Sequence, residues 1–272
     1  MILVLVAIFA FMTISKGEAR LAAKYAMEYD DVMIPSDSAS IALGKYIAES
    51  HGCQKCHTPD YSGDIMIDAP PFTVVPSNLT SGAGGVGTTF SDADWLRAIR
   101  HGVGQDGRGL VVMPSEAYYF MSDVEVGALV AYLKQVPAVD HELPRTKFKT
   151  LGKFIAGVSD DFKLTPDAML DSPRIPMPEK GPTVEWGEYR ASVLCQVCHG
   201  KGLTGNQPPD PDSPFAPDLR IAQSWGLDAF TRALREGETP SRQLNGAFMP
   251  WPEIGHLDDT EIEALYAYIK TL

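Results

Sequence analysis

The pattern Cys-X-X-Cys-His occurs twice in this 272-residue chain, at residues 53–57 and 195–199, and the two copies use all four cysteines. This spacing is typical of covalent haem attachment, in which two thiols form thioethers with the haem vinyl groups and the adjacent histidine binds the iron. The sequence therefore predicts two covalently bound haem c groups. The residues that would hold them are Cys53, Cys56, His57, Cys195, Cys198 and His199.

Other uses of paired cysteines explain this pattern less well. A thioredoxin-like dithiol needs a strand–helix–strand context, which the sequence does not show around either pair. A zinc site needs four ligands, and each distant Cys-Cys-His triplet would lack the fourth. Structural disulfides would leave the histidine after each pair without a role.

The ligand on the far side of each iron decides between an electron carrier and a catalyst. Each half of the chain contains a Met-Pro pair, at Met113 and at Met249, after the cysteine motif and before the last helix of that half. A methionine thioether stabilises ferrous iron and raises the potential, so we predict both as sixth ligands. Methionine more often fills a core, and other side chains compete for the role. They are Met66, Met121, His101 and His256.

The elements that must position these residues also repeat. Before the first motif, Gly44 and Tyr46 stand two apart in an apolar segment, and Gly187 and Tyr189 do so before the second. A glycine lets another helix cross closely, and an aromatic side chain then fills the neighbouring space. We expect each half to begin with such a helix and to pack it against its own last helix.

The other helices of each half show start signals and helical spacing. Ser122 and Asp258 each precede a glutamate by three residues, which is the pattern of a capping box before a terminal amphipathic helix. Middle helices are predicted over residues 91–99 and about 227–235. The Pro-rich segment 138–182 is predicted to be a mostly extended linker whose phenylalanines hold it against a domain surface.

The first fourteen residues are almost wholly apolar. A full membrane span needs about 20 residues, so this stretch lies between a signal sequence and a span. No Lys or Arg precedes it, and no clear small-X-small cleavage site follows it. We therefore predict a retained anchor helix over residues 1–26. An uncleaved signal, or a helix packed on a partner subunit, remains the alternative.

The net charge of −12 also limits the function. An acidic chain binds nucleic acid poorly, since affinity for nucleic acid comes largely from basic residues on phosphates. No nucleic-acid partner is expected. The same charge favours docking on a basic patch of a redox partner.

With its haem motifs, its Met-Pro pairs and its repeated helices, the chain resembles two class I c-type cytochromes in tandem. The resemblance covers residues 38–137 and 183–272, and it implies an all-α fold: an N-terminal membrane-anchor helix and two tandem class I cytochrome c domains joined by the linker 138–182. It is similar to cytochrome c subunits of respiratory or photosynthetic membrane complexes. The resemblance also implies that the soluble domains lie on the periplasmic or extracytoplasmic side.

These features predict a membrane-tethered carrier of single electrons between the partners of a membrane redox complex, or to a soluble electron-transfer protein. No catalytic residue is expected, because each iron would keep six ligands and the protein would only set potential, exposure and docking. The rival is a di-haem peroxidase-like enzyme, which also carries two widely separated haem motifs but needs an open iron position. A subunit that holds haem without a redox role is a third reading.

Overall fold

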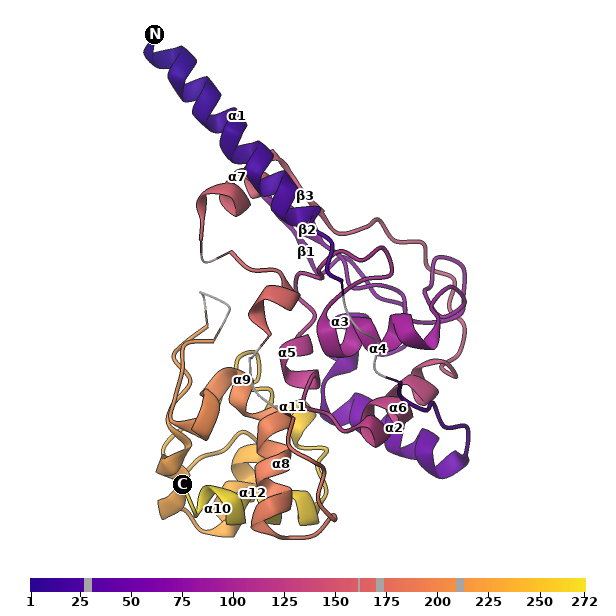
Figure 1. Cartoon of the computed structure of the whole chain (residues 1–272). Coiled ribbons are helices and arrows are strands. Elements are labelled where there is room, and N and C mark those ends of the chain that lie inside the picture. The colour runs from indigo at the N-terminus through magenta and orange to yellow at the C-terminus, as the bar shows by residue number, and fades with distance from the viewer. Residues whose placement is uncertain (27–30, 161, 170–173, 209–212) are drawn as a thin grey trace. The chain divides into compact units, whose positions relative to one another are not determined.

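The computed structural model describes residues 1–26, 31–160, 162–169, 174–208 and 213–272, which form two compact units (Figure 1). Unit 1 consists of Met1–Gly44, Cys53–Glu116 and Val126–Asp171, and unit 2 of Lys45–Gly52, Ala117–Glu125 and Ser172–Leu272. Two short pieces of the first sequence repeat therefore belong to the same unit as the second repeat.

Unit 1 is mainly helical, and three of its helices, α2, α5 and α6, have some residues in the pieces that belong to unit 2. Its helices are α1 (Ile2–Leu21), α2 (Ser38–Ser50), α3 (Cys53–His57), α4 (Asp92–His101), α5 (Ser115–Tyr118), α6 (Asp123–Leu133), α7 (Thr150–Val158) and the 3-10 helix η1 (Thr165–Ala168). Its strands β1 (Ile67–Asp68), β2 (Phe72–Val74) and β3 (Lys147–Phe148) form a small antiparallel sheet in the order β1-β2-β3.

The helices of unit 2 surround one apolar core. This core contains Phe230, Leu257, Ile262 and Leu265, all nearly inaccessible to solvent. The elements are α8 (Val184–Leu194), α9 (Gln196–His199), η2 (Lys201–Leu203), η3 (Leu219–Ser224), α10 (Leu227–Arg235), α11 (Trp251–Ile254) and α12 (Asp259–Ile269).

The predicted crossing of first and last helices is confirmed in both repeats. A Cβ atom on Gly44 of α2 would lie 2.0 Å from the carbonyl oxygen of Ala128 in α6. A Cβ atom on Gly187 of α8 would lie 2.0 Å from the carbonyl oxygen of Ala264 in α12. Only glycine allows the backbones to approach this closely. The equal distances show that the two repeats use the same packing.

The predicted helix starts are confirmed, with one difference. Ser91 and Asp94 form a reciprocal capping box at the start of α4, and Ser122 caps α6 with its hydroxyl 3.1 Å from the backbone nitrogen of Glu125. Asp258 likewise accepts from the backbone N–H of Glu261 at 3.0 Å. In the second box the N–H of residue 258 is accepted by the hydroxyl of Tyr46 and not by Glu261.

A buried charged cluster in unit 2 joins residues of both repeats. Arg190 lies 2.6 Å from a carboxylate oxygen of Glu125 and 3.2 Å from one of Glu261, and all three side chains are almost fully buried. Tyr189 donates its hydroxyl to Glu125, and Tyr46 donates to Glu261. The tyrosine hydroxyls also accept the backbone N–H groups of residues 122 and 258, at 2.8 and 3.0 Å. Each repeated tyrosine therefore completes the cap of the other repeat's last helix.

The segment predicted as an extended linker contains the nine-residue helix α7. Phenylalanines hold this segment in place as expected. The Phe148 ring, just before α7, contacts Phe72 of β2 and Phe162 of the same segment at centroid distances of 5.9 and 5.7 Å. The helix escaped prediction because it contains two glycines and no side-chain cap. It forms because its small residues pack closely on α1.

The N-terminal helix α1 ends at Leu21, short of the predicted residue 26. Residues 27–30 lie outside the described part of the chain. Within the described residues, α1 is the one helix long and apolar enough to cross a membrane. Only Thr13 and Gly17 of this helix are buried, and both face α7, which lies beside α1 (Figure 1).

Candidate haem sites

Both cysteine motifs fold into a short helix at the end of a longer one. The first forms α3 directly after α2, and the second forms α9 after α8, with Cys195 as its N-cap. Residues three or four apart lie on one face of a helix. The two sulfur atoms and the histidine ring of each motif therefore come from one side, which is the arrangement that covalent attachment and iron ligation by a single haem require.

The two motif histidines make the same hydrogen bond. His57 Nδ1 lies 2.8 Å from the carbonyl oxygen of Ser77, and His199 Nδ1 lies 2.8 Å from that of Pro217. Donation from Nδ1 fixes the tautomer and leaves the Nε2 lone pair for a metal. Burial lowers the pKa of both histidines, which favours the neutral ring that an iron ligand needs.

The first cysteine of each motif lacks the properties of a redox or zinc-binding thiol. Burial raises the pKa of Cys53 and of Cys195 to about 12, so each thiol stays protonated. A nucleophilic thiol has the opposite shift. In the described segments, no three His, Cys, Asp or Glu side chains gather as a metal site. A porphyrin fits this set, because its own nitrogens leave the protein only two axial positions to fill.

The two Met-Pro pairs adopt matching turns. The carbonyl oxygen of Met113 accepts the backbone N–H of Ser115 at 2.8 Å, and that of Met249 accepts the N–H of Trp251 at 2.7 Å. A short helix, α5 or α11, follows each turn. Met249 packs against the same apolar core as Cys195. Met113 lies in unit 1 with the first motif, and both methionines stay predicted ligands.

The competing ligands differ in how far the structure supports them. Met121 is fully buried at the entry of α6 and belongs to unit 2, whereas the first motif belongs to unit 1. Met66 is exposed, and so is His256, as expected for a residue before the last helix. His101 is half-buried at the end of α4. Neither exposed residue suits a haem pocket.

Buried indole nitrogens also fit a haem. The Nε1 atoms of Trp95 and Trp251 are shielded from solvent and have no hydrogen-bond partner among the described residues. A buried unsatisfied donor costs free energy, so each calls for an acceptor. A haem propionate is such an acceptor. Trp251 comes directly after the second Met-Pro pair, in the segment where a haem held by Met249 would lie.

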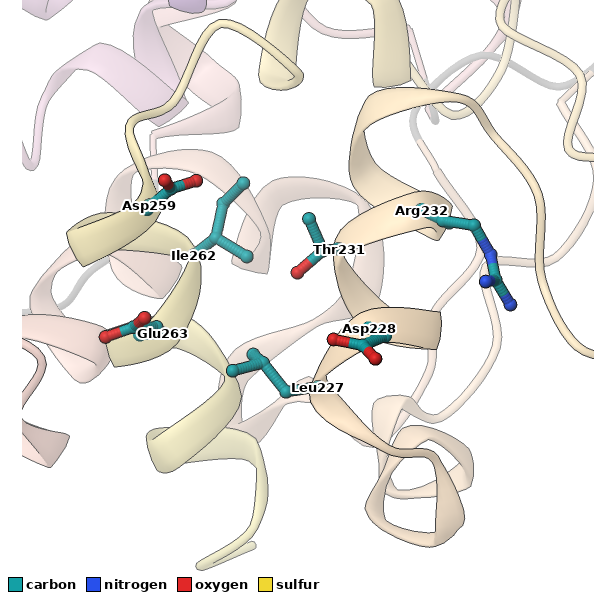
Figure 2. A pocket seen from close by; sticks show the side chains of 7 residues that line it. All are labelled: Leu227, Asp228, Thr231, Arg232, Asp259, Ile262 and Glu263. Carbon is teal, nitrogen blue, oxygen red and sulfur yellow. The ribbon is translucent and has the colours of Figure 1, made fainter.

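A separate pocket in unit 2 lies between α10 and α12 (Figure 2). Figure 2 shows Asp228 on one helix and Glu263 on the other, with Ile262 and Leu227 between them. None of the predicted haem-attaching or iron-binding residues lines this pocket.

The two carbonyl groups that orient the histidines could not be predicted from the sequence. Backbone acceptors leave no side-chain signature. One indication was available, because Asn78-Leu79-Thr80 and Asp218-Leu219-Arg220 occupy equivalent places in the two repeats. The residue before each triplet supplies the carbonyl.

Comparison with known proteins identifies two cytochrome c domains. The family model described as Cytochrome c matches residues 41–137 and again residues 190–272. The two matched ranges each contain a Met-Pro pair and a cysteine motif.

Three relatives are cytochrome subunits of dehydrogenases. The chain is 33% identical over 268 residues to the fructose dehydrogenase cytochrome subunit of Gluconobacter japonicus, covering 86% of this chain and 52% of the relative. It is 31% identical over 276 residues to the gluconate 2-dehydrogenase cytochrome c subunit of Pantoea cypripedii, covering 87% and 60%. It is 26% identical over 277 residues to the alcohol dehydrogenase (quinone) cytochrome c subunit of Gluconacetobacter polyoxogenes, covering 87% and 57%. The chain thus spans little more than half the length of these relatives.

Proposed function

The chain belongs to the cytochrome c family, and we propose that it is a membrane-tethered carrier of single electrons that serves a membrane-bound dehydrogenase. Two cytochrome c domains, each with its own cysteine motif, make it a protein of two haem c groups. The observation that carries the proposal is the repeated geometry of the predicted ligands: a histidine held by a 2.8 Å hydrogen bond to a backbone carbonyl, and a methionine held in a Met-Pro turn.

The residues of each site support electron transfer without bond chemistry. The haem groups, when bound, supply the one-electron exchange between ferric and ferrous iron. His57 and His199 would bind from one side, and Met113 and Met249 would close the other. A closed iron position leaves no place for a substrate. The protein would then fix the potential through its axial ligands and the burial of the sites.

We infer the partner from the relatives and from charge. The named relatives are subunits of fructose, gluconate and alcohol dehydrogenases. Such a complex would oxidise its substrate and pass the electrons released to this subunit. The net charge of −12 favours a basic docking patch on the partner. A soluble electron-transfer protein is a second acceptor of the same kind.

We also propose that α1 anchors the chain and that both haem domains lie on the periplasmic or extracytoplasmic side. The packing of Gly17 on α7 supports a retained helix rather than a cleaved signal. A cleaved signal sequence is absent from the mature protein, so it would not contribute to the packing of the folded domain. The exposed apolar side chains of α1 suit lipid.

The spin state of the two haems tests this function. In the purified, haem-loaded full chain, we expect electron paramagnetic resonance to show two low-spin ferric haems, and a peroxide assay to show no turnover. Met249→Ala should convert one haem to high spin, whereas Met66→Ala, which changes an exposed methionine, should leave both unchanged. A high-spin haem with peroxide turnover in the unaltered protein would instead support the peroxidase-like alternative.

A further inference from the structure

Helices α1 and α7 interlock through small residues. A Cβ atom on Gly17 of α1 would lie 1.8 Å from the carbonyl oxygen of Lys153, and one on Gly157 of α7 would lie 1.9 Å from that of Thr13. Glycines at such a crossing let two backbones touch, which is a common way for helices to associate in membranes. The two helices therefore form one close-packed pair, which we call the α1–α7 pair.

Polar contacts fix the same pair at one end. The Arg20 guanidinium donates to the carbonyl oxygens of Ala156 at 2.7 Å and Ser159 at 2.8 Å, and also to that of Phe162. The contacts with Ala156 and Ser159 satisfy carbonyl groups at the C-terminal end of α7 that have no partner within the helix. Lys153 pairs with Glu18 at 2.7 Å. The position of α7 on α1 is thus specified by charge as well as by packing.

The outer face of α7 is apolar and exposed. Leu151, Ile155 and Val158 are 50%, 40% and 52% exposed, and their spacing places them on one side of the helix. The residues on the other side, Gly152, Ala156 and Gly157, are buried. Three large apolar side chains on one short helix need a cover that the chain's described residues do not supply.

The position of α7 along α1 indicates what that cover is. The Phe154 ring contacts Phe9 at a centroid distance of 6.4 Å, edge to face. Phe9 lies inside the uninterrupted apolar stretch of α1, whose side chains are exposed. If these side chains enter lipid, α7 lies at the level where α1 leaves it.

The charge of the surrounding sequence fits a membrane surface. Residues 16–26 and 145–163 contain eight Lys and Arg but three Asp and Glu, a net charge of +5 in a chain of net charge −12. Anionic headgroups attract basic residues next to a membrane helix. An apolar stripe flanked by basic residues is the pattern of a helix that lies in the interfacial plane.

We propose that α7 is a membrane-surface helix whose residues Leu151, Ile155 and Val158 enter the boundary between headgroups and acyl chains of an anionic bilayer. The proposal rests on the anchoring role proposed for α1. The α1–α7 pair would then hold unit 1 at the membrane by two apolar surfaces, so that the nearby domain cannot swing freely on a single helix.

Site-directed spin labelling of the haem-loaded full chain tests this directly. The native cysteines are joined to haem, so a new cysteine can be labelled alone. Labels would be placed by Val158→Cys on α7, Val6→Cys on α1, and Val184→Cys, a 37% exposed valine at the start of α8, as the matched control. The protein would be reconstituted in vesicles of phosphatidylcholine and phosphatidylglycerol. Collision rates with oxygen and with a water-soluble nickel complex would then be measured.

We expect the label at residue 158 to show a severalfold higher ratio of oxygen to nickel collisions than the control at residue 184. If residue 158 is as accessible to nickel as the control while residue 6 lies in lipid, the inference about α7 fails and the anchor stands. If residue 6 is also accessible to nickel, both fail. Protection of residue 158 from both reagents would show a protein partner or a second copy on this face, and would also overturn the proposal.

Discussion

His51 is a half-buried histidine whose ring is held neutral. Its Nδ1 lies 2.9 Å from the carbonyl oxygen of Ile47, so Nδ1 donates and Nε2 accepts from Arg190 at 3.5 Å. Burial, and after it the positive charge of Arg190, lowers the pKa of His51 to about 3. An unfolded histidine has a pKa of about 6.5. Between these values the unfolded chain binds a proton that the folded chain excludes.

We therefore predict that acid weakens the fold through His51. The stabilising effect of the neutral ring is complete above about pH 6.5 and is lost as the pH falls, by at most about 1.4 kcal/mol per pH unit. Denaturant unfolding between pH 7 and pH 4 measures this slope. His51→Gln should make the slope shallower, because the glutamine side chain does not titrate. An unchanged slope in this variant would mean that other groups cause the acid sensitivity.

The candidate haem-binding residues could be named from the sequence, whereas their hydrogen-bond partners could not. Four cysteines and two histidines stand in a spacing that has one good explanation, and the repeated Met-Pro pairs follow from comparing the halves. The carbonyl groups of Ser77 and Pro217 were not predicted, because any residue type can supply a carbonyl. Tyr46 and Tyr189 were recognised as a repeated pair, but their hydrogen bonds to the other repeat's cap depend on tertiary structure.

Among the elements, two helix crossings at glycines, α2 on α6 and α8 on α12, hold the helices that lead into the cysteine motifs. Gly44 and Gly187 each sit against a backbone carbonyl of the last helix of their repeat. Because a backbone atom cannot move aside as a side chain can, a methyl group there must push the helices apart. We predict that Gly187→Ala lowers the free energy of unfolding by about 1–3 kcal/mol, as measured by denaturant titration.

Gly181→Ala provides the matched control for this prediction. Its Cβ would meet only a methyl group of Thr183, at the ordinary contact distance of 3.5 Å. We expect little change in stability from it. Equal effects of the two substitutions would show that the loss of glycine flexibility, and not the helix crossing, sets the cost.

Helix α7 is an element that the sequence alone did not predict. The nine residues of α7 include two glycines, and no side chain caps the start of the helix. Its helical state depends on α1, which is more than a hundred residues away in the sequence. By contrast, α4 and α10 were predicted within two residues, because the capping box of α4 and the apolar spacing of both helices are local signals.

At the scale of the whole molecule, unit 2 needs residues from both repeats. Arg190 compensates one carboxylate from each, Glu125 and Glu261, inside a region closed to solvent. Removing one partner of a buried ion pair typically costs about 3–5 kcal/mol, because a charge is left without compensation. We predict a loss of this size in the full chain on Arg190→Met, measured as the change in the free energy of unfolding.

The isolated segment 174–272 provides a comparison for this prediction. It lacks Glu125 and Tyr46, so Arg190 keeps only one of its two carboxylate partners. We expect the fragment to be less stable than the full chain, and Arg190→Met to cost less in the fragment. If the fragment is as stable as the full chain and loses as much on substitution, the second repeat folds without help from the first.

A redox titration of methionine variants tests the central claim most directly, since that claim is that each iron lies between a histidine and a methionine. Met113→His and Met249→His should each lower one of the two midpoint potentials by on the order of a hundred millivolts, within the roughly 0.8 V range that axial ligands span, while the other midpoint stays in place. Met66→His should shift neither. If neither Met113→His nor Met249→His lowers a midpoint potential, these methionines are not the ligands and the proposed closed sites are wrong.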